Sequence, residues 1–332
     1  MNYDVILATY NGEKYVVEQL DSIINQTVKP ANIYIRDDGS QDKTVEIIKN
    51  YILNAETNEP EINIEFKDDG LNVGYIKNFE KLVGFAVSEF VFFSDQDDIW
   101  IVNKAECLLN KLKDDSVSVV FSDAYLVNNN KEILGTLWGY VNYLPATNSI
   151  TIDKILINNV VTGATLACRR SFFINLLPFP ALVPHDHWIS SNAVIKNCLS
   201  YCEEKLILYR QHENNQIGAS KTSIKAKVKG VFNRAKMNKR ISYYIQIHEL
   251  IENLVSRGIL SADCKVSSGM RNFITYMDVI YKGKIKRDIS FNHPKNNVLG
   301  VFFKKDYLIN KTKKVVATDL LDSFLIRTIF KK

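Results

Sequence analysis

Disulfide bonds and membrane spans are the first features that this sequence lacks. Its five cysteines are scattered and odd in number, which argues against a disulfide framework and favours a reducing compartment. The closest pair, Cys198 and Cys202, is weak support for a metal site, and buried structural thiols are the alternative. No apolar run reaches the roughly 18 residues of a membrane-spanning helix. Residues 1–7 lack the basic segment of a signal peptide, so we expect a cytoplasmic protein.

Positive charge is scarce in the first two thirds of the chain and concentrated in the last third. Residues 221–332 hold 24 Lys or Arg and 8 Asp or Glu, which leaves 18 of the 42 basic and 29 of the 37 acidic residues in 1–220. The first part is therefore acidic and the second strongly basic, although the whole chain carries only +5. Such a basic tail suits a nucleic acid or the anionic inner face of a membrane, or forms a solvated helical surface.

Strand and helix patterns alternate along residues 1–217. Short apolar segments with strand character occur at 3–10, 32–36, 62–66, 90–93, 118–123, 162–170 and 206–212. Helical spacing of apolar residues follows most of them, which predicts an α/β fold with a Rossmann-like, mostly parallel sheet flanked by helices. Residues 128–148 have no clear period and predict a long loop or a hairpin that covers a site.

Polar clusters follow three of these predicted strands: Thr9 to Glu13, Asp37 to Ser40, and Asp95 to Asp98. A single acidic strand end is common, because Asp often caps the helix that comes next. In a parallel sheet, however, ligands bind beyond the carboxyl ends of the strands, which lie along one edge. We therefore expect the three clusters to meet in one cleft.

The densest cluster is Asp95-Gln96-Asp97-Asp98, with three carboxylates in four residues. Carboxylates this close repel one another unless a cation lies among them, and a divalent metal with oxygen ligands is the usual solution. Such a site suits a nucleotide diphosphate. A metal there bridges the two phosphates and neutralises the charge that develops on the leaving group.

A candidate general base occurs later in the chain. Asp186 lies between His185 and His187, just before Trp188, where a loop enters a predicted helix. A carboxylate beside an aromatic wall has its pKa raised towards working pH, which suits a base, and the alternative is that Asp186 only caps the helix. His212, at the end of the last predicted strand, is either a ligand of the metal or a phosphate, or a structural histidine.

Four segments resemble, in order and spacing, the motifs of the family-two inverting glycosyltransferases with the GT-A fold: 5–12, 35–42, 93–100 and 185–188. The resemblance covers about residues 1–215. The third and fourth motifs, with the Tyr-Arg-Gln-His segment at 209–212, are similar to those of rhamnosyltransferase-like members that build bacterial surface polysaccharides. The chain lacks the Gln-x-x-Arg-Trp motif and the membrane spans of processive synthases of the cellulose type.

The resemblance implies a role for each matching residue. The residues that would hold the base and ribose of a nucleotide-sugar are Thr9, Tyr10, Asn11, Glu13, and Asp37 or Asp38. Asp95 and Asp97 match the Asp-x-Asp pair, with Asp97 as the direct ligand of Mn or Mg, and with Asp95 in the same metal site and positioning the loop or the nucleotide. His212 would complete the metal site, Asp98 would face the donor sugar, and Asp186 matches the catalytic base.

These roles imply a metal-dependent glycosyltransferase that inverts the anomeric configuration in a single displacement. Asp186 would remove the proton from an acceptor hydroxyl, whose oxygen then attacks the anomeric carbon. The subgroup favours transfer of L-rhamnose from dTDP-rhamnose to a growing, lipid-linked bacterial surface polysaccharide.

Other functions stay open on the sequence alone. A hexosyl- or N-acetylhexosaminyltransferase that uses a UDP-sugar would show the same motifs. A nucleotidyltransferase shares the sheet, but the first turn here lacks the Gly-rich loop that cradles a triphosphate. A phosphoryl-receiving switch domain would need a late lysine and a shorter chain. A nucleic-acid-binding protein would explain the basic tail but not Asp186, so we expect no nucleic-acid partner.

The resemblance does not extend to the last third of the chain. Helical patterns at 241–255 and 266–280 predict a smaller, basic, mainly helical domain over 218–332, after a catalytic domain over 1–217. Near the C-terminus, aromatic and basic residues mix as they do in helices that lie on a membrane surface. We expect this domain to bind the anionic inner face of the plasma membrane or to make an oligomer contact, and a homo-oligomer is compatible with it.

Overall fold

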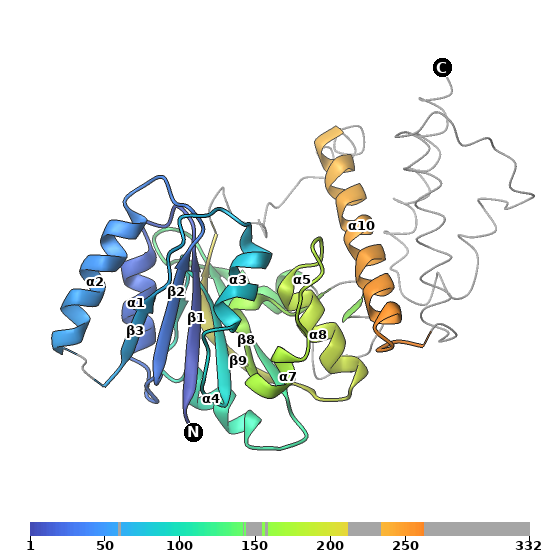
Figure 1. Cartoon of the computed structure of the whole chain (residues 1–332), viewed down its shortest axis with the longest axis horizontal. Helices are drawn as coiled ribbons and strands as arrows, with labels where there is room; N and C mark the ends of the chain where they lie inside the picture. Colours follow the sequence, from blue (N-terminus) through green and yellow to red (C-terminus); the bar gives the residue numbers. More distant parts are fainter. Residues whose placement is uncertain (59–60, 142, 144–154, 157–158, 212–233, 262–332) are drawn as a thin grey trace, which may run out of the picture. The chain divides into compact units, whose positions relative to one another are not determined.

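The structure is a computed structural model that describes residues 1–58, 61–141, 143, 155–156, 159–211 and 234–261 (Figure 1). The chain divides into two compact units, Met1–Ser220 and Lys221–Lys332, and each is described by itself. None of the helices in the described ranges is both long and apolar enough to cross a membrane.

A parallel block of four strands forms the first half of the sheet. In spatial order it consists of β3 (Asn63–Phe66), β2 (Asn32–Asp37), β1 (Tyr3–Thr9) and β4 (Phe90–Asp95). The helices that connect these strands are α1 (Val16–Ile24), α2 (Thr44–Asn58) and α3 (Tyr75–Val83). The predicted α/β fold with parallel strands and helical crossovers is therefore confirmed.

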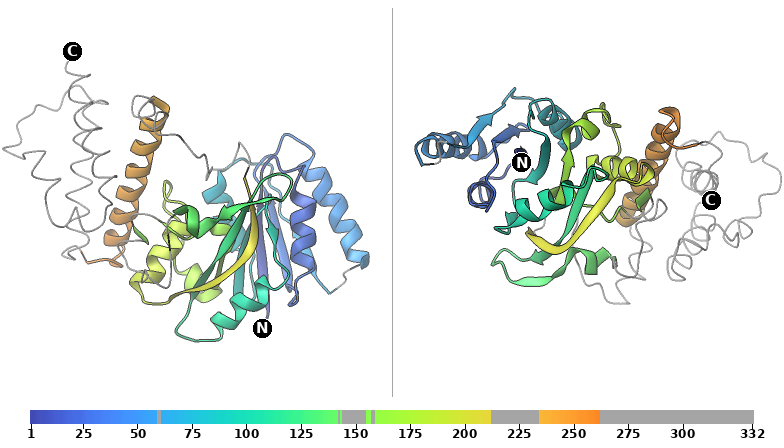
Figure 2. Two further views of the ribbon diagram at one scale, coloured as in Figure 1. Left: turned by 180° about the vertical axis from the view of Figure 1, so that it is seen from behind. Right: turned by 90° about the horizontal axis from the view of Figure 1, so that it is seen from below.

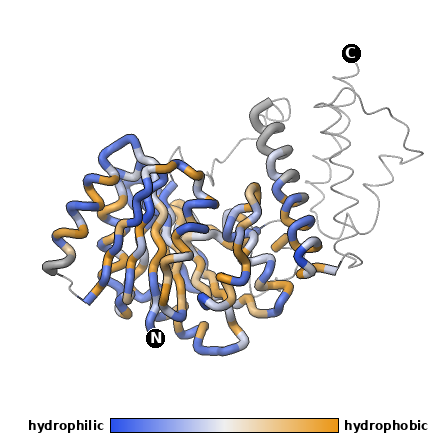
Figure 3. The backbone as a smooth tube through the Cα atoms, in the orientation of Figure 1, coloured by the Kyte–Doolittle hydropathy of each residue, from blue (hydrophilic) through white to orange (hydrophobic). Residues whose placement is uncertain are grey.

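The register of this block places three strand ends side by side. Thr9 pairs with Asp37 on the neighbouring β2, and Ala8 pairs with Asp95 on β4. The polar clusters after β1, β2 and β4 therefore lie along one edge of the sheet, as the sequence predicted. Figure 3 shows the central strands as largely hydrophobic, with hydrophilic loops at this edge.

The second half of the sheet contains antiparallel pairs. The nine-stranded sheet continues from β4 through β8 (Leu166–Arg169), β6 (Val119–Val127), β9 (Leu199–Arg210) and β5 (Ile99–Trp100), and β7 (Ile133–Thr136) also pairs with β6. β8 is antiparallel to both of its neighbours, whereas β9 runs parallel to β6. Figure 2 shows the long, curved β9 strand (yellow) beside β6. The alternation of strands and helices did not predict these pairings, because their partners are distant in sequence.

Among the described residues, helical segments that accompany the second half include α4 (Lys104–Leu112), α5 (Leu137–Val141), η1 (Gly163–Thr165), α7 (Arg170–Ile174) and α8 (His185–Ile195). The segment predicted as a loop or hairpin is a β6–β7 hairpin followed by α5, and residues 144–148 lie outside the described ranges. Fully buried apolar residues fill the core beneath the sheet edge, among them Leu7, Leu20, Phe92 and Leu108.

In the second unit the structure describes one long helix, α10 (Arg234–Ser256). It includes the helix predicted over 241–255. Gly258 has a φ of 68°, a left-handed conformation that ends helices and that glycine adopts without strain. The helix predicted over 266–280 and the aromatic, basic C-terminal stretch lie outside the described residues.

Candidate active site

The loop after β2 holds the end of β1 through the carboxylate of Asp37. The Thr9 hydroxyl donates to Asp37 Oδ2 at 2.8 Å, and the backbone N–H and hydroxyl of Ser40 donate to the same carboxylate at 2.7 and 2.6 Å. Ser40 Oγ in turn accepts a hydrogen bond from the N–H of Asn11 at 2.7 Å. Asp37 is 1 % exposed, so in this structure it shapes the loop.

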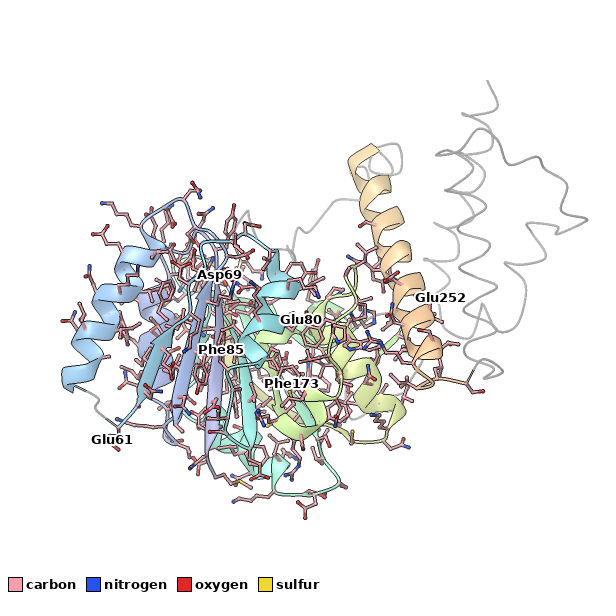
Figure 4. The ribbon with its side chains drawn as sticks, in the orientation of Figure 1. Glu61, Asp69, Glu80, Phe85, Phe173 and Glu252 are labelled. Carbon is pink, nitrogen blue, oxygen red and sulfur yellow. The ribbon has the colours of Figure 1, made fainter. Side chains whose placement is uncertain are left out.

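Asp38 fixes the loop that leads into α3. Its two carboxylate oxygens accept hydrogen bonds from the N–H groups of Val73 at 2.7 Å and Gly74 at 2.9 Å. The buried Arg36 donates to Asp38 at 3.3 Å and contacts Asp69, which is labelled at this edge of the sheet in Figure 4. The carboxylate of Asp38 therefore has several partners within the chain.

Two side chains of the turn after β1 bind the backbone of the loop after β2, and a third side chain, that of Tyr10, is exposed. Asn11, with a φ of 51°, accepts a hydrogen bond from the N–H of Gln41 at 2.8 Å through its side-chain oxygen. Glu13 accepts a hydrogen bond from the N–H of Lys43 at 3.0 Å. The side chain of Tyr10, by contrast, is 48 % exposed. The loop is thus held firmly while the Tyr10 ring stays accessible.

The acidic cluster lies at the end of β4 and beside the last strand. Asp95 and Asp97 are partly buried, and Asp98 is 2 % exposed. Burial and the nearby carboxylates of Asp97 and Asp186 raise the pKa of Asp95 to about 7, although Lys104 opposes this shift. Burial, followed by Asp97 and Asp95, also raises the pKa of Asp98 well above its usual value. The mutual repulsion inferred from the sequence is thus present in the folded chain.

A fully buried lysine lies behind this cluster. Lys104 Nζ is 3.5 Å from the centre of the Trp100 ring and donates to the carbonyl oxygen of Ala164 at 2.8 Å. Burial lowers the pKa of Lys104 well below its usual value, and the charges of Asp98 and Asp95 act in the opposite direction. Lys104 was not among the site residues predicted from the sequence. A lysine on the buried face of an amphipathic helix, six residues after Asp98, was the available signal.

Arg210, at the end of β9, is a second cation that the sequence analysis did not assign. Its N–H donates to Asp98 Oδ1 at 3.2 Å and its Nε donates to the carbonyl oxygen of Asp97 at 3.0 Å. Its guanidinium also pairs with Glu18 at 2.5 Å and lies 4.8 Å from the Tyr15 ring centre. Arg210 therefore holds the acidic loop against α1.

Asp186 lies in the first turn of α8 and is held by three donors. Asp186 Oδ1 accepts hydrogen bonds from the N–H of His187 at 2.6 Å and from Asn159 Nδ2 at 3.3 Å, and Oδ2 accepts one from the N–H of Gly163 at 3.1 Å. Burial raises the pKa of Asp186 to about 6, against the effect of these hydrogen bonds. The sequence did not predict a site role for Asn159 or Gly163, because only the fold brings them to Asp186.

Three electrostatic effects indicate that Asp186 lies near the acidic cluster. Its charge contributes to the raised pKa of Asp95. Burial, followed by the charges of Asp186 and Asp95, also raises the pKa of Tyr75 to about 12. Tyr209 has a raised pKa through burial and through all four of the site's carboxylates. Asp186, the acidic cluster and the phenol groups of Tyr75 and Tyr209 therefore lie within electrostatic reach of one another.

The two histidines that flank Asp186 belong to the core. His185 stacks on Phe93 with ring centres 5.4 Å apart, and burial lowers its pKa to about 3. His187 contacts the carbonyl oxygen of Ile155 through Nε2 at 2.9 Å, and burial lowers its pKa to about 4. Both are therefore neutral near pH 7, and they anchor the turn that carries Asp186.

The acidic cluster also fits a divalent metal bound together with a diphosphate. Within the described part of the chain, no group of three or more His, Cys, Asp or Glu side chains is arranged to hold an ion, and His212 lies outside that part. Mg²⁺ in phosphate-transferring sites is, however, often held by one or two carboxylates, with phosphate and water oxygens as the other ligands. Asp95 and Asp97 are two such carboxylates. Burial and then the charges of Asp97 and Asp186 raise the pKa of Asp95, and a cation would relieve the negative charge.

The sequence profile of Glycosyl transferase family 2 matches residues 4–177, which include the first three motifs. The dTDP-rhamnosyl transferase RfbG of Shigella flexneri is 31% identical over 243 residues, which cover 67% of this chain and 77% of that protein. The UDP-Glc:alpha-D-GlcNAc-diphosphoundecaprenol beta-1,3-glucosyltransferase WfgD of Escherichia coli is 25% identical over 206 residues, which cover 60% of this chain and 75% of that protein.

Solved structures share the fold. Residues 1–349 of Staphylococcus aureus TarS in complex with UDP match with a TM-score of 0.51 and 15% identity, over 84% of this chain and 87% of that one. The mannosyltransferase PcManGT of Pyrobaculum calidifontis, in complex with GDP-Man and Mn²⁺, matches with a TM-score of 0.52 and 15% identity, over 99% and 88%. The structural matches and the mixed sheet show that the chain has the GT-A fold. Because the family profile covers more than half of it, the chain belongs to glycosyl transferase family 2.

Proposed function

We propose that this glycosyltransferase inverts the anomeric configuration of the sugar that it transfers, with Asp186 as the general base. The observation that carries the proposal is the state of the Asp186 carboxylate. Three donors fix its position beside the acidic cluster, and its pKa of about 6 makes it largely ionised yet basic near pH 7.

The proposed reaction is a single displacement. Asp186 accepts the proton of an acceptor hydroxyl, and the oxygen of that hydroxyl forms a bond to the anomeric carbon of the donor. The bond from this carbon to the nucleoside diphosphate breaks on the opposite face, and the bonding electrons leave with the diphosphate. Attack from one face and departure from the other invert the configuration.

Asp97 and Asp95 are the residues that would hold Mn or Mg, with His212 as a proposed further ligand. A divalent cation there supplies positive charge to the departing diphosphate. The Mn²⁺ in the complex of the Pyrobaculum calidifontis mannosyltransferase supports the use of a metal by a protein of this fold. Arg210 holds the acidic loop through hydrogen bonds to Asp98 and to the carbonyl oxygen of Asp97, and the buried Lys104 lies against Trp100, just after this loop.

The turn after β1 would bind the nucleoside. We assign the nucleobase to the exposed ring of Tyr10, and the ribose to polar groups of Thr9, Asn11 and Glu13, with Asp37 or Asp38 behind them. Asp98 would reach a hydroxyl of the donor sugar through Oδ2, which has no hydrogen-bond partner among the described residues. That oxygen is buried, so this contact requires a shift of the acidic loop when the donor binds.

The donor that we propose is dTDP-L-rhamnose, because the relative from Shigella flexneri is a dTDP-rhamnosyl transferase. The glucosyltransferase from Escherichia coli supports a UDP-sugar as the second candidate. Its name includes a diphosphoundecaprenol, which supports a lipid-linked glycan as the acceptor and a place on the inner face of the plasma membrane. A basic surface in 221–332 would hold the protein there.

Thermal unfolding with nucleotide-sugars tests the donor. A ligand that binds only the folded chain raises its Tm in proportion to the logarithm of its concentration over Kd. We expect dTDP-L-rhamnose with Mn²⁺ to raise the Tm more than UDP-glucose, UDP-GlcNAc or GDP-mannose does. A larger shift with a UDP-sugar would favour the second candidate, and no shift with any of the four would contradict a nucleotide-sugar donor from this set.

A further inference from the structure

The amide of Gln96 joins the acidic loop to the loop after β1. Gln96 Oε1 accepts a hydrogen bond from the N–H of Tyr10 at 2.6 Å, and Gln96 Nε2 donates to the carbonyl oxygen of Tyr10 at 2.7 Å. The side-chain amide thus pairs with both polar groups of one backbone residue, as a neighbouring strand would. The two residues are 86 positions apart in the sequence.

The position of this amide continues the ladder between β1 and β4. The last pair of that ladder is Ala8 with Asp95, one residue before Gln96. Past this point the two strands separate into their loops, and the Gln96 side chain supplies the next pair of hydrogen bonds. It therefore holds the two loops together at the point where each begins to carry its polar side chains.

Gly12 provides the space that the amide occupies. A Cβ atom at residue 12 would overlap Gln96 Oε1 and lie 2.5 Å from Gln96 Cδ. Gly12 is not among the residues with a positive φ, so its backbone conformation does not itself require a glycine. The lack of a side chain at position 12 is thus needed for the paired hydrogen bonds of Gln96.

We propose that Gln96 is a positioning residue that couples the binding of a divalent metal to the binding of the nucleotide. The inference rests on the proposed function, in which Asp95 and Asp97 hold the metal and the loop from Thr9 to Glu13 holds the nucleoside. A nucleoside diphosphate that contacts both loops binds with the full affinity of both contacts only while the distance between the loops is fixed. Gln96 fixes that spacing, because it lies between the two aspartates and binds the backbone of Tyr10.

The test is a measurement of coupling between two ligands. Titration calorimetry gives the Kd of dTDP, and separately of UDP, with and without Mn²⁺. In Gln96→Ala we expect the metal-free Kd to stay within about twofold of wild type, and the enhancement of affinity by Mn²⁺ to fall by about tenfold. A merely structural role would weaken binding equally with and without metal.

Gly12→Ala supplies an independent route to the same state. The new methyl group displaces the Gln96 amide, so we expect the same loss of enhancement by Mn²⁺. The double variant should lose no more than either single variant, because both changes break one link. Gly84→Ala is the matched control, since residue 84, directly after α3, has helical backbone angles and its Cβ would meet only the carbonyl oxygen of Lys81, at 3.4 Å.

The nucleotide affinities of wild type and of Gln96→Ala distinguish failure of the proposed function from failure of the inference about Gln96. If wild type binds neither nucleotide in the presence of Mn²⁺, the proposed function fails before Gln96 is tested. If wild type binds and the enhancement by Mn²⁺ is unchanged in Gln96→Ala, the inference is wrong while the proposed function stands. Additive losses in the double variant would also overturn the link between Gly12 and Gln96.

Discussion

At the scale of single residues, the orientation of Asp186 is set by groups that the fold brings to it. The N–H groups of His187 and Gly163 and the amide of Asn159 hold both carboxylate oxygens. Burial disfavours the charged form and raises the pKa of Asp186 to about 6, whereas these donors favour the charged form. The balance leaves a carboxylate that is ionised near pH 7 and can still accept a proton.

Replacement of the base tests its role directly. We expect Asp186→Asn to lower the rate of transfer by about 100-fold or more, because an amide cannot accept the proton of the acceptor. The Kd of the donor nucleotide should stay near the wild-type value. Asp115→Asn, a change at a fully exposed side chain, is the control and should transfer normally. Transfer by Asp186→Asn above about a hundredth of the wild-type rate would refute the assignment.

The pH dependence of the reaction follows from the same carboxyl group. Because the base must be ionised, kcat/KM should rise with pH up to about 6, by about tenfold per pH unit, and level off above it. His185 and His187 do not titrate in this range, since burial lowers their pKa values to about 3 and 4. Asp95 also titrates in this range, because burial and the neighbouring carboxylates raise its pKa to about 7. Initial rates are therefore measured at saturating Mn²⁺, which would keep Asp95 ionised. Activity that is flat from pH 4.5 to 8 would contradict a base with this pKa.

At the scale of secondary-structure elements, helix α4 connects the two sides of the site. Lys104, in its first turn, lies against Trp100 of β5 and donates to Ala164 of η1. The N–H of the preceding residue in η1, Gly163, donates to Asp186. The buried Lys104 therefore contacts Trp100, which follows the acidic cluster, and η1, the segment that orients the base.

Loss of this lysine should destabilise the fold. Lys104→Met keeps the apolar stem but removes the hydrogen bond from Nζ to the buried carbonyl oxygen of Ala164 and the contact of Nζ with the Trp100 ring. A buried acceptor left without its hydrogen bond costs about 1–3 kcal/mol, so we expect a decrease of that order in the free energy of unfolding. Urea denaturation at pH 8 measures it. Lys111→Met, at an exposed position of the same helix, is the matched control, and equal effects of the two changes would contradict the prediction.

At the scale of the whole molecule, the chain combines an acidic catalytic unit with a basic second unit. Family and fold support a glycosyltransferase over the nucleotidyltransferase and nucleic-acid-binding alternatives. We propose that the positive charge of 221–332 attracts the chain to the anionic lipids of a membrane surface.

Removal of the basic unit tests this use. A chain of residues 1–220 should no longer sediment with vesicles that contain anionic lipid, whereas the full chain should sediment with them. Binding of the full chain should also weaken as salt rises, because salt screens the charges. Neutral vesicles are the control. Unchanged sedimentation of 1–220 would refute the membrane role, and circular dichroism verifies that this fragment is folded.

The sequence by itself determined the parallel block of the sheet, because apolar runs and helical spacing are local patterns. It also predicted that Thr9, Asp37 and Asp95 meet, since parallel strands bring their carboxyl ends to one edge. Asp186 was a candidate from its neighbours alone. Only the tertiary structure decided the antiparallel pairings, the buried cations Lys104 and Arg210, and the paired hydrogen bonds of Gln96. Those contacts join residues far apart in the chain, and no local pattern records which distant group a side chain will meet.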